Sequence, residues 1–376
     1  MDWPFPARLA QAFAALGARV DGVCPRASPL HRAKAPMRLH KFSFLAPLPA
    51  LAAAIEKTSP DLVIPCDDLA AELLWRLGQT RECFTPLLRR SLGEKQSYPI
   101  LAARNDFLAE AKGAGVPVAD NIAIENEDDL ARAMAQLGLK LVIKADASWG
   151  GDGVVIAHDF ETARAAFTRL RRVSRLKALG RAIKRGEPHF LVRMRYPRPA
   201  RPGAQLFVAG HPATSAIACW QGRLLAANHF DVAIAQGTGP ASVVTRTACS
   251  QMQNAAAVIA ARFGLSGLYG LDYMRDADGK IFLLEINPRA TPTSHLALGP
   301  GHDLAAALLS AAGHPVPDRP AVTNQARIAL FPQELRRDPQ SPRLAGAYHD
   351  LPREDPMLLR ALLPGGRPLT GFSQAF

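Results

Sequence analysis

The sequence predicts an α/β protein that is α+β in parts, with a small N-terminal α/β unit, a middle unit and a unit built on an antiparallel sheet. Three observations predict this. The apolar run LVIPC at Leu62–Cys66 is followed by a helical pattern from Leu69, as in an α/β unit. Two strand–loop–strand patterns follow, at Leu139–Ala157 and Tyr269–Arg289. Runs with helical periodicity lie between them.

Length and composition are those of an ordinary globular enzyme. The chain has 376 residues, of which 48% are hydrophobic and 21% charged, enough for two or three domains with a substantial core. No run approaches the roughly 18 apolar residues of a membrane span, and no basic-then-apolar signal opens the sequence. The five cysteines lie scattered, without zinc spacing. We therefore expect a cytoplasmic protein without a membrane partner.

The first hundred residues predict a small α/β unit with an unusual start. Ala7–Gly17 has a helical pattern and Ala18–Val23 a strand pattern. Units of this kind normally begin with a strand, whereas this sequence opens with Asp2, Trp3 and Pro4. Either the first strand is missing or the start has been assigned late.

Two acids, Asp67 and Asp68, directly follow the strand predicted at Leu62–Cys66. Open α/β sheets bind ligands at the carboxyl ends of their strands, so these acids are placed to contact a ligand. A helix begins next, and an N-cap role explains one of the two. Both interpretations stay open.

The middle unit begins with a helix, a Gly-Val-Pro turn, a short strand and a second helix at Ala103–Met134. A strand ending at Lys144 and a second strand, VVIA, are then joined by a glycine-rich loop. The loop begins at Ser148 and contains Gly150, Gly151 and Gly153. Glycines let a backbone approach phosphate closely. Because this loop leads into a strand, it is neither a P-loop nor a dinucleotide fingerprint. A plain turn is the alternative.

The segment YGLDYMRDADGKIFLLEINPR, Tyr269–Arg289, predicts a β-hairpin. Asp278-Gly279 between two apolar runs is a strong signal for a two-residue turn. Counting outward from that turn places Asp272 directly opposite Glu285. Asn287 shares their face because side chains alternate with a period of two. The cross-strand partner of Asn287 is a glycine, which leaves space.

Two ionised carboxylates at cross-strand distance repel each other unless a cation lies between them or one is protonated. Asp272, Glu285 and the carboxamide of Asn287 offer only hard oxygen donors. These donors favour Mg²⁺ or Mn²⁺ over zinc. Arg289 would then lie near the anion that the metal holds. A solvated hairpin with an accidental acid pair is the alternative.

The stretch LEINPR at Leu284–Arg289, with an acid about a dozen residues upstream, resembles the metal-binding hairpin of ATP-grasp enzymes. These include carboxylate-amine and carboxylate-thiol ligases and the ATP-binding domain of the carbamoyl-phosphate synthase large chain. Such enzymes use ATP to activate a carboxylate as an acyl phosphate and then join it to an amine, a thiol or another nucleophile. The resemblance spans roughly Ala103 to Asp303.

The resemblance implies roles for several residues upstream. The loop from Ser148 to Gly153 is similar to the phosphate lid of these enzymes, and Lys144 matches the lysine that reaches the nucleotide phosphates. Arg104 matches a basic residue at the start of a helix that also contacts phosphate. An exposed arginine at a helix start is an equal alternative for Arg104.

The segment Gly203–Ala227 has the pattern of a strand, a turn and a hairpin closed near Gln221-Gly222. The same resemblance places there the hinge that reads the adenine edge. Its candidates are Gln205, Phe207 and Val208. Many family members carry an acid in the hinge, where this sequence has Leu206. Recognition of the ribose is therefore open, and an ordinary core strand is the alternative.

The net charge of +12 is concentrated in one block. Arg164–Arg201 holds 13 Lys or Arg against one acid, Glu187, so the rest of the chain is formally neutral. Such a block suggests nucleic acid, because neutralising phosphates releases counterions. It shows few aromatics and no docking motif, which disfavours that partner. An electropositive flap that attracts ATP or an acidic substrate and a solvated basic surface are the two alternatives.

Two loops are expected to flank the acceptor site by resemblance. The loop GTGPASVV, Gly237–Val244, precedes a helix at Ser250–Phe263, and ATPTSHLALGPG follows the hairpin. Thr293 and His295 are the candidate substrate contacts, although a lone His is more often a satisfied hydrogen-bonding residue. The tail from Pro315, with a strand at RIALF, either packs back or contacts a second subunit of a homodimer.

The resemblance thus implies an ATP-grasp ligase that uses ATP and Mg²⁺ or Mn²⁺, joins a small carboxylate to an amine or other nucleophile, and releases ADP and phosphate. A nucleotide-binding pseudoenzyme and a basic nucleic-acid-binding protein are the alternatives. The expected domains are an N-terminal α/β domain (residues 1–102), a lid-bearing subdomain (103–202), a catalytic antiparallel-sheet subdomain (203–314) and a C-terminal extension (315–376).

Overall fold

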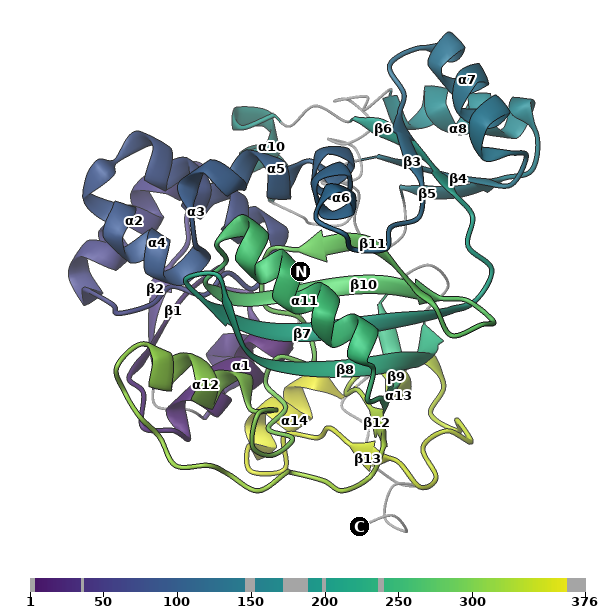
Figure 1. Cartoon of the computed structure of the whole chain (residues 1–376). Coiled ribbons are helices and arrows are strands. Elements are labelled where there is room, and N and C mark those ends of the chain that lie inside the picture. The colour runs from purple at the N-terminus through teal and green to yellow at the C-terminus, as the bar shows by residue number, and fades with distance from the viewer. Residues whose placement is uncertain are drawn as a thin grey trace.

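The computed structural model describes residues 4–34, 37–145, 153–171, 189–197, 201–235 and 240–363 of the chain. Within these residues the strands form three sheets, namely a parallel pair near the N-terminus, a four-stranded sheet and a seven-stranded sheet (Figure 1). The mixed α/β class predicted from the sequence is confirmed. None of the described helices has the length and apolar composition that a membrane span requires.

The N-terminal part is a small α/β unit. Its strands β1 (Val20–Cys24) and β2 (Met37–Lys41) pair in parallel. Its helices are α1 (Phe5–Ala14), α2 (Pro47–Thr58), α3 (Asp68–Thr80), α4 (Thr85–Leu92) and α5 (Tyr98–Ala102), with short 3-10 helices at Pro29–Arg32, Glu82–Phe84 and Lys95–Ser97. The helix and the strand predicted for the first two dozen residues correspond to α1 and β1.

The strand predicted at residues 62–66 is wrong, because this segment is extended but pairs with no strand of the described chain. Its backbone groups bond elsewhere. The Val63 N–H donates to Ser91 Oγ at 2.9 Å, and the Pro65 carbonyl accepts from the Ala290 N–H at 3.0 Å. Pro65 itself has no N–H to give to a sheet. The segment still leads directly into α3.

The four-stranded sheet is antiparallel, in the order β3-β6-β4-β5. Its strands are β3 (Asn121–Ala123), β4 (Leu141–Ala145), β5 (Val154–Ala157) and β6 (Pro202–Leu206). Helices α7 (Glu127–Leu137) and α8 (Phe160–Arg171) cover one face, where Leu130, Leu141 and Phe167 are buried (Figure 1). Because β6 belongs to this sheet, the sheet extends past the domain boundary expected at residue 202.

The seven-stranded sheet has the order β11-β10-β7-β8-β9-β12-β13. Its strands are β7 (His211–Trp220), β8 (Arg223–Ala235), β9 (Ala241–Arg246), β10 (Gly267–Arg275), β11 (Ile281–Asn287), β12 (Arg327–Ala329) and β13 (Tyr348–His349). Ile217 of β7 packs into the same core as α11 (Ser250–Phe263), whereas Ala216 packs into the core with α1 and α12 (Leu304–Ala311). The sheet is therefore a central layer with helices on both faces (Figure 1).

The β7–β8 hairpin closes where the sequence predicts it. Gln221 and Gly222 have φ values of +49° and +80°, the pattern of a two-residue turn that matches the twist of the strands. The helix predicted from Ser250 to Phe263 is α11 with the same bounds.

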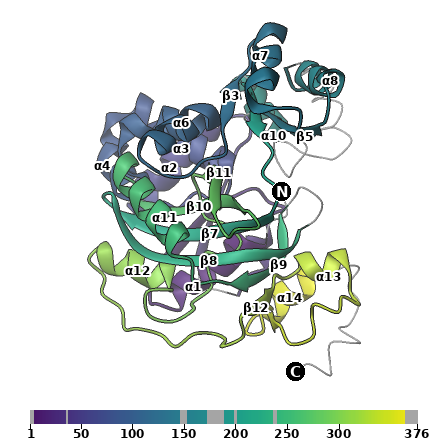
Figure 2. The same cartoon turned by 45° about the vertical axis from the view of Figure 1, so that its right-hand side comes forward.

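The C-terminal residues pack back onto the chain. Strand β12 pairs antiparallel with β9 and extends the sheet. Helices α13 (Gln333–Arg337) and α14 (Pro356–Leu362) lie beside it, and Leu335 and Leu358 share a buried cluster with Ala7 of α1 (Figure 2). A contact with a second subunit stays a prediction.

Helix α6 (Arg104–Gly113) lies between the two larger sheets, against β3 of one and β11 of the other. Farther along the chain, α10 (His189–Arg195) packs Val192 into the main core. The first turn of α6 therefore faces the gap where β4 and the β10–β11 hairpin approach each other.

Candidate functional site

The β10–β11 hairpin brings Asp272 opposite Glu285, as predicted, but not by the predicted route. The two-residue turn is wrong. Asp276 N donates to Lys280 O at 3.0 Å, so the loop holds three residues and ends at Gly279, whose φ is +78°. This is the three-residue loop with a left-handed glycine.

A bulge then restores the register. Tyr273 pairs with Leu283 and Asp272 pairs with Glu285, so Leu284 is the extra residue on β11. Leu283 N–H meanwhile donates to the Pro117 carbonyl at 2.8 Å, on the outer edge of the hairpin. The longer loop and the bulge each shift the register by one residue, and the two shifts cancel. The acids consequently share one face.

Asp272 is held by neutral donors. Thr214 Oγ1 of the neighbouring strand β7 donates to Asp272 Oδ1 at 2.7 Å, and Asn287 Nδ2 donates to Asp272 Oδ2 at 2.8 Å. Burial, and after it the charge of Glu285, raise the pKa of Asp272 to about 6. The two hydrogen-bond donors that hold this carboxylate thus carry no positive charge.

Space for Asn287 comes from Gly270, its cross-strand partner. A Cβ at Gly270 would lie 2.3 Å from the Thr291 methyl group and 3.3 Å from Asn287 Cβ. Any larger residue at this position would therefore displace the side chains that border the acid pair. This agrees with the space that the sequence predicted at the glycine.

Glu285 faces the basic side of the site. Arg104 Nη2, from the first residue of α6, donates to Glu285 Oε2 at 2.6 Å. Burial opposes ionisation, but Arg104 and Lys144 outweigh it and lower the pKa of Glu285. Burial, followed by repulsion from Arg104, lowers the pKa of Lys144 to about 8. The two cations predicted to contact phosphate therefore lie with the acid pair in one electrostatic cluster.

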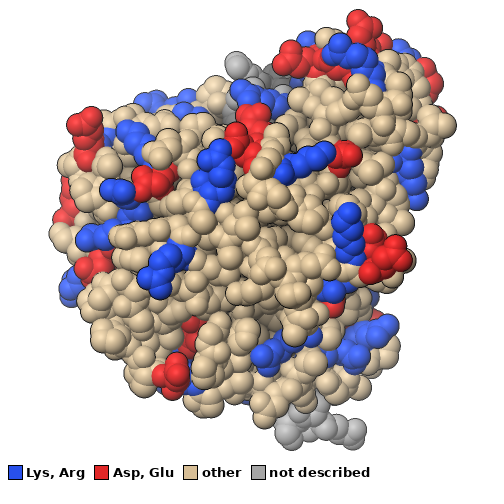
Figure 3. All heavy atoms as spheres, viewed as in Figure 1, with Lys and Arg blue, Asp and Glu red and all other residues tan. Residues whose placement is uncertain are grey.

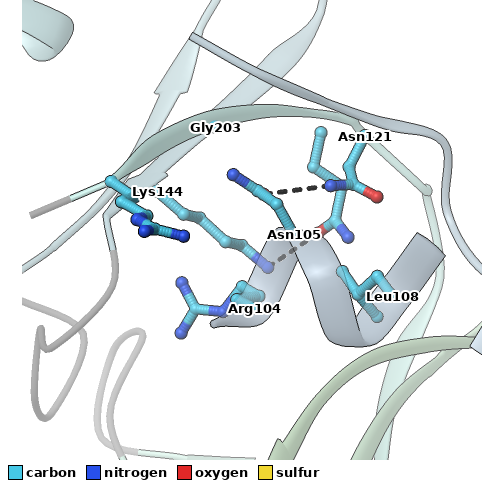
Figure 4. A pocket seen from close by; sticks show the side chains of 8 residues that line it. Arg104, Asn105, Leu108, Asn121, Lys144 and Gly203 are labelled. Carbon is cyan, nitrogen blue, oxygen red and sulfur yellow. Dashed lines mark hydrogen bonds between the residues drawn. The ribbon is translucent and has the colours of Figure 1, made fainter. Parts of the chain in front are cut away.

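Figure 4 shows Arg104 of α6 and Lys144 of β4 lying side by side at the rim of a small pocket. Lys144 Nζ donates to Gln205 Oε1 at 2.8 Å, while Gln205 Nε2 is buried and has no partner among the described residues. The cavity has a volume of about 10 Å³, room for a single water. The lining residues are Arg104, Asn105, Leu108, Asn121, Lys144, Arg201, Gly203 and Gln205.

Arg289 lies on the other side of the acid pair. Its Nη2 donates to Asn287 Oδ1 at 3.1 Å and its Nε donates to Asp68 Oδ1 at 2.9 Å. Burial opposes the charge of Arg289, but Asp68 outweighs it and raises the pKa. The acid next to it, Asp67, caps α3 by accepting from Ala70 N at 2.7 Å. The N-cap interpretation is thus confirmed for Asp67, and contact of Asp68 with a ligand stays a prediction.

The remaining predicted site residues are more scattered. Ser148, Gly150 and Gly151 lie outside the described residues, and Gly153 is buried in the turn before β5. Phe207 and Val208 follow β6, where Phe207 N donates to Lys140 O at 3.2 Å. Of the loop predicted at residues 237–244, residues 237–239 are outside the described chain and residues 241–244 belong to β9.

Of the predicted substrate contacts, both in the loop after β11, Thr293 is buried and His295 is partly buried. His295 Nε2 lies 3.0 Å from Asp350 of the C-terminal residues, and Arg8 Nη2 lies 3.0 Å from the same carboxylate. Neither predicted contact lines the pocket beside Lys144. A role in binding substrate stays a prediction for both.

The basic block of residues 164–201 falls partly outside the described residues, which omit 172–188 and 198–200. On the face shown in Figure 3, basic and acidic side chains are interspersed. Arg164 pairs with Glu161 at 2.8 Å and Arg201 with Asp106 at 3.4 Å. Both interpretations of the block stay open.

The donors around Asp272 suit a hard divalent cation. In the part of the chain that the structure describes, no cluster of three His, Cys, Asp or Glu side chains forms, so the site rests on two carboxylates and an amide. The amide oxygen of Asn287 faces Arg289, and it would turn toward a cation only by rotating the side chain. The two acids are therefore the primary ligands that this geometry offers.

Comparison with known proteins identifies the architecture. No protein-family model matches the sequence, and no curated protein matches it significantly. Solved structures do match. N5-carboxyaminoimidazole synthetase from Staphylococcus aureus is similar over 84% of this chain and 76% of its own, with a TM-score of 0.60 and 13% identity.

A second similar structure is the biotin carboxylase domain of 2-oxoglutarate carboxylase from Hydrogenobacter thermophilus, with MgADP, ADP and bicarbonate. It covers 83% of this chain and 68% of its own, with a TM-score of 0.61 and 14% identity. A third is carboxyaminoimidazole ribonucleotide synthase from Asperigillus clavatus complexed with ATP, with 84% and 76% coverage, a TM-score of 0.60 and 16% identity.

The chain has the ATP-grasp fold. The seven-stranded sheet with its β10–β11 hairpin, the four-stranded sheet with Lys144 and the small N-terminal α/β unit are its parts in this chain. Sequence reasoning missed two features of the candidate site, namely the hydrogen bond from Thr214 to Asp272 and the pairing of Asp68 with Arg289. It also missed the pairing of Asp350 with Arg8 and His295. The position of Asp68 after an extended apolar run was the one signal that pointed toward a site.

Proposed function

We propose that this chain is an ATP-dependent ligase that activates a small carboxylate as an acyl phosphate and joins it to an amine or another nucleophile, releasing ADP and phosphate. One observation carries the proposal. Asp272 and Glu285 face each other between Arg104 and Lys144 on one side and Arg289 on the other. A fully solvated hairpin face would not concentrate three cations around a half-buried acid pair.

The residues present fit Mg²⁺ or Mn²⁺ carried by ATP. The raised pKa of Asp272 reflects burial beside a second carboxylate, a situation that a divalent cation relieves. Asp272 and Glu285 would hold the ion, with Asn287 as an additional oxygen donor after its side chain rotates. When bound, such an ion would screen the negative charge of the nucleotide phosphates.

Arg104 and Lys144 are placed to hold the nucleotide phosphates. Both lie at the rim of the pocket in Figure 4, and Lys144 already hydrogen-bonds Gln205. The unpartnered Nε2 of Gln205 would donate to an acceptor on the nucleotide. The backbone of Phe207 and Val208 after β6 and the loop from Ser148 to Gly153 complete the proposed ATP site.

The chemistry that follows needs positioning more than an activated side chain. Arg289 would orient the acceptor carboxylate, whose oxygen attacks the γ-phosphorus of ATP and breaks its bond to the bridging oxygen of ADP. The nucleophile then attacks the acyl carbon, and inorganic phosphate leaves. Arg104 and Lys144 stabilise charge on the phosphates in both steps.

The structural neighbours support this reaction class by what they bind. Their structures contain ATP, ADP or MgADP, and one contains bicarbonate. One of them is described as a dimer. For this chain the partners proposed are a small carboxylate or bicarbonate and a small nucleophile, and a homodimer stays a prediction.

The decisive experiment is a screen of the purified chain with MgATP against a panel of small acids, bicarbonate included, each with and without amines. We expect ADP and phosphate in equal amounts for at least one pair. Glu285→Gln and Lys144→Ala, which should leave the fold intact, would abolish this turnover. Production of AMP and pyrophosphate, or full activity in both variants, would contradict the proposal.

A nucleotide-binding pseudoenzyme is the second candidate. Glu285 is engaged by Arg104, Arg289 is engaged by Asp68, and the pocket beside Lys144 is small. Tight binding of ADP in calorimetry, together with no phosphate release for any acid and amine in the panel, would favour this alternative.

A further inference from the structure

Two segments far apart in the chain meet at Arg289. Residues 65–68 run into α3 of the N-terminal unit, and residues 289–290 follow β11 of the seven-stranded sheet. A main-chain bond joins Ala290 N to Pro65 O at 3.0 Å, and a side-chain ion pair joins Arg289 Nε to Asp68 Oδ1 at 2.9 Å. A main-chain hydrogen bond and a side-chain ion pair thus join the two segments at the same place.

The contacts of Arg289 fix the direction in which its guanidinium points. Nε donates to Asp68, Nη1 donates to the Ala290 carbonyl at 3.2 Å and Nη2 donates to Asn287 at 3.1 Å. These bonds use three of the five N–H donors that the planar group carries. Because the guanidinium is rigid, fixing its Nε edge sets the orientation of the remaining donors.

Asp68 is not required for capping the helix that it begins. The cap of α3 is Asp67, which accepts from Ala70 N. An acid in the first turn also interacts favourably with the helix dipole, but either residue would satisfy that preference. The specific contact of Asp68 is the one to Arg289, and the Asp68 side chain remains 32% exposed at the edge of the site.

We propose that Asp68 is a positioning residue that holds Arg289 in the orientation needed to bind the acceptor carboxylate, so that the N-terminal unit forms part of the acceptor site. The proposal rests on the ligase function proposed above. It assigns Asp68 no contact with the reacting atoms. Removal of Asp68 should therefore weaken binding of the acid substrate and leave the affinity for the nucleotide unchanged.

The chain supplies a matched set of variants. Asp68→Ala removes the ion pair, while Asp68→Glu keeps a carboxylate that can reach Arg289. Asp67→Asn is the control, since it removes a charge one residue away while asparagine keeps the cap. Thermal unfolding and the Kd of MgADP, measured for each full-length variant, check that the fold and the nucleotide site persist.

The first measurement does not depend on turnover of a substrate by the chain. Phenylglyoxal modifies accessible guanidinium groups, and peptide mass spectrometry follows the rate at Arg289 alone. We expect faster labelling of Arg289 in Asp68→Ala, and rates close to the parent chain in Asp68→Glu and Asp67→Asn. Unchanged labelling in Asp68→Ala, or the same increase in Asp67→Asn, would overturn the proposal.

The second measurement is kinetic, with bicarbonate as the probe acid and MgATP as the nucleotide. Loss of a group that orients another typically costs about 10- to 100-fold. We expect KM for bicarbonate to rise by this factor in Asp68→Ala with KM for ATP unchanged, and Asp68→Glu to recover most of it. A parallel rise in both KM values would point to a structural role and contradict the proposal. If no acid supports turnover, the ligase function fails by itself, and the labelling result still decides the role of Asp68.

Discussion

Two carboxylates of this protein, the half-buried Asp272 and the buried Asp350, have different electrostatic surroundings. Asp272 accepts hydrogen bonds from the neutral groups of Thr214 and Asn287 and lies opposite another acid, and burial with that acid raises its pKa to about 6. Asp350 lies between Arg8 and His295, both at 3.0 Å. Although burial opposes it, these two partners hold the pKa of Asp350 below its ordinary value.

The difference separates a structural carboxylate from one that is suited to binding. Asp350 has its positive charge within the chain, so the ion pairs tie the C-terminal residues to α1 and to the loop after β11. The two groups that donate hydrogen bonds to Asp272 are neutral, and the opposing charge of Glu285 makes the charge of Asp272 costly, a cost that protonation or a bound cation would relieve. The raised pKa of an acid that lies opposite a second acid is thus the property that marks the candidate metal site.

The largest effect expected from this comparison is on stability. Asp350→Asn leaves Arg8 without its carboxylate in a buried setting, and breaking one partner of a buried pair costs about 3–5 kcal/mol. Glu56→Gln is the control, because the Glu56 pair with Arg81 is exposed and such pairs contribute about 1 kcal/mol or less. Urea unfolding of both variants measures the difference, and equal losses would show that the Asp350 cluster is not a structural tie.

The sequence predicted the features that depend on neighbouring residues. The β7–β8 turn at Gln221-Gly222 and helix α11 are local, and both lie where expected. The opposition of Asp272 and Glu285 was also predicted, although it depends on a longer loop and a bulge that cancel. The bulge at Leu284 lies next to a contact from outside the hairpin, that of Leu283 with Pro117, and leaves no pattern in the strand itself.

Features set by distant partners could not be predicted. The segment at residues 62–66 reads as a strand, but its partners are a helix side chain and the loop at Ala290. The Asp68–Arg289 pair spans 221 residues and the His295–Asp350 pair spans 55. Alternation and turn signals carry no information about such contacts, so these pairs are found only in the three-dimensional structure.

The second prediction concerns the contribution of Asp272 to activity. Asp272→Asn keeps the shape and the hydrogen bonds but removes the charge, and we expect phosphate release to fall about 10²- to 10³-fold, the scale of losing one preorganised electrostatic group. Asp278→Asn in the same hairpin is the control, because this acid lies exposed in the loop. Single-turnover assays of ADP formation compare them, and similar rates in the two variants would remove Asp272 from the site.

The third prediction is the pH dependence of stability. Since the folded pKa of Asp272, about 6, exceeds the ordinary value of 3.8, the folded state binds this proton more tightly than the unfolded state. The contribution of Asp272 is therefore most favourable below pH 4, decreases by roughly 2–3 kcal/mol as pH rises to 6, and is constant above. Unfolding free energies of the parent chain minus those of Asp272→Asn should follow this curve.

Adding MgADP makes the test of this pH dependence more specific. A cation beside Asp272 favours the ionised form, so MgADP should flatten the curve of the parent chain between pH 4 and 6. A difference between the two proteins that is independent of pH would contradict the raised pKa. A slope that MgADP leaves unchanged would argue against a metal ion at Asp272.

The smallest effect concerns the cation across the site. Burial and Arg104 lower the pKa of Lys144 to about 8, so in the free protein this side chain loses its charge as pH rises through 8. Phosphate binding favours the charged form, and the Kd of ADP should therefore increase by up to about tenfold per pH unit above 8. Lys144→Arg is the matched variant, because a guanidinium stays protonated throughout this range.

Calorimetry from pH 7 to 9.5 should give a rising Kd for the parent chain and a flat one for the variant. Since the nucleotide phosphates are already fully ionised there, equal slopes in both proteins would place the titrating group elsewhere than at Lys144.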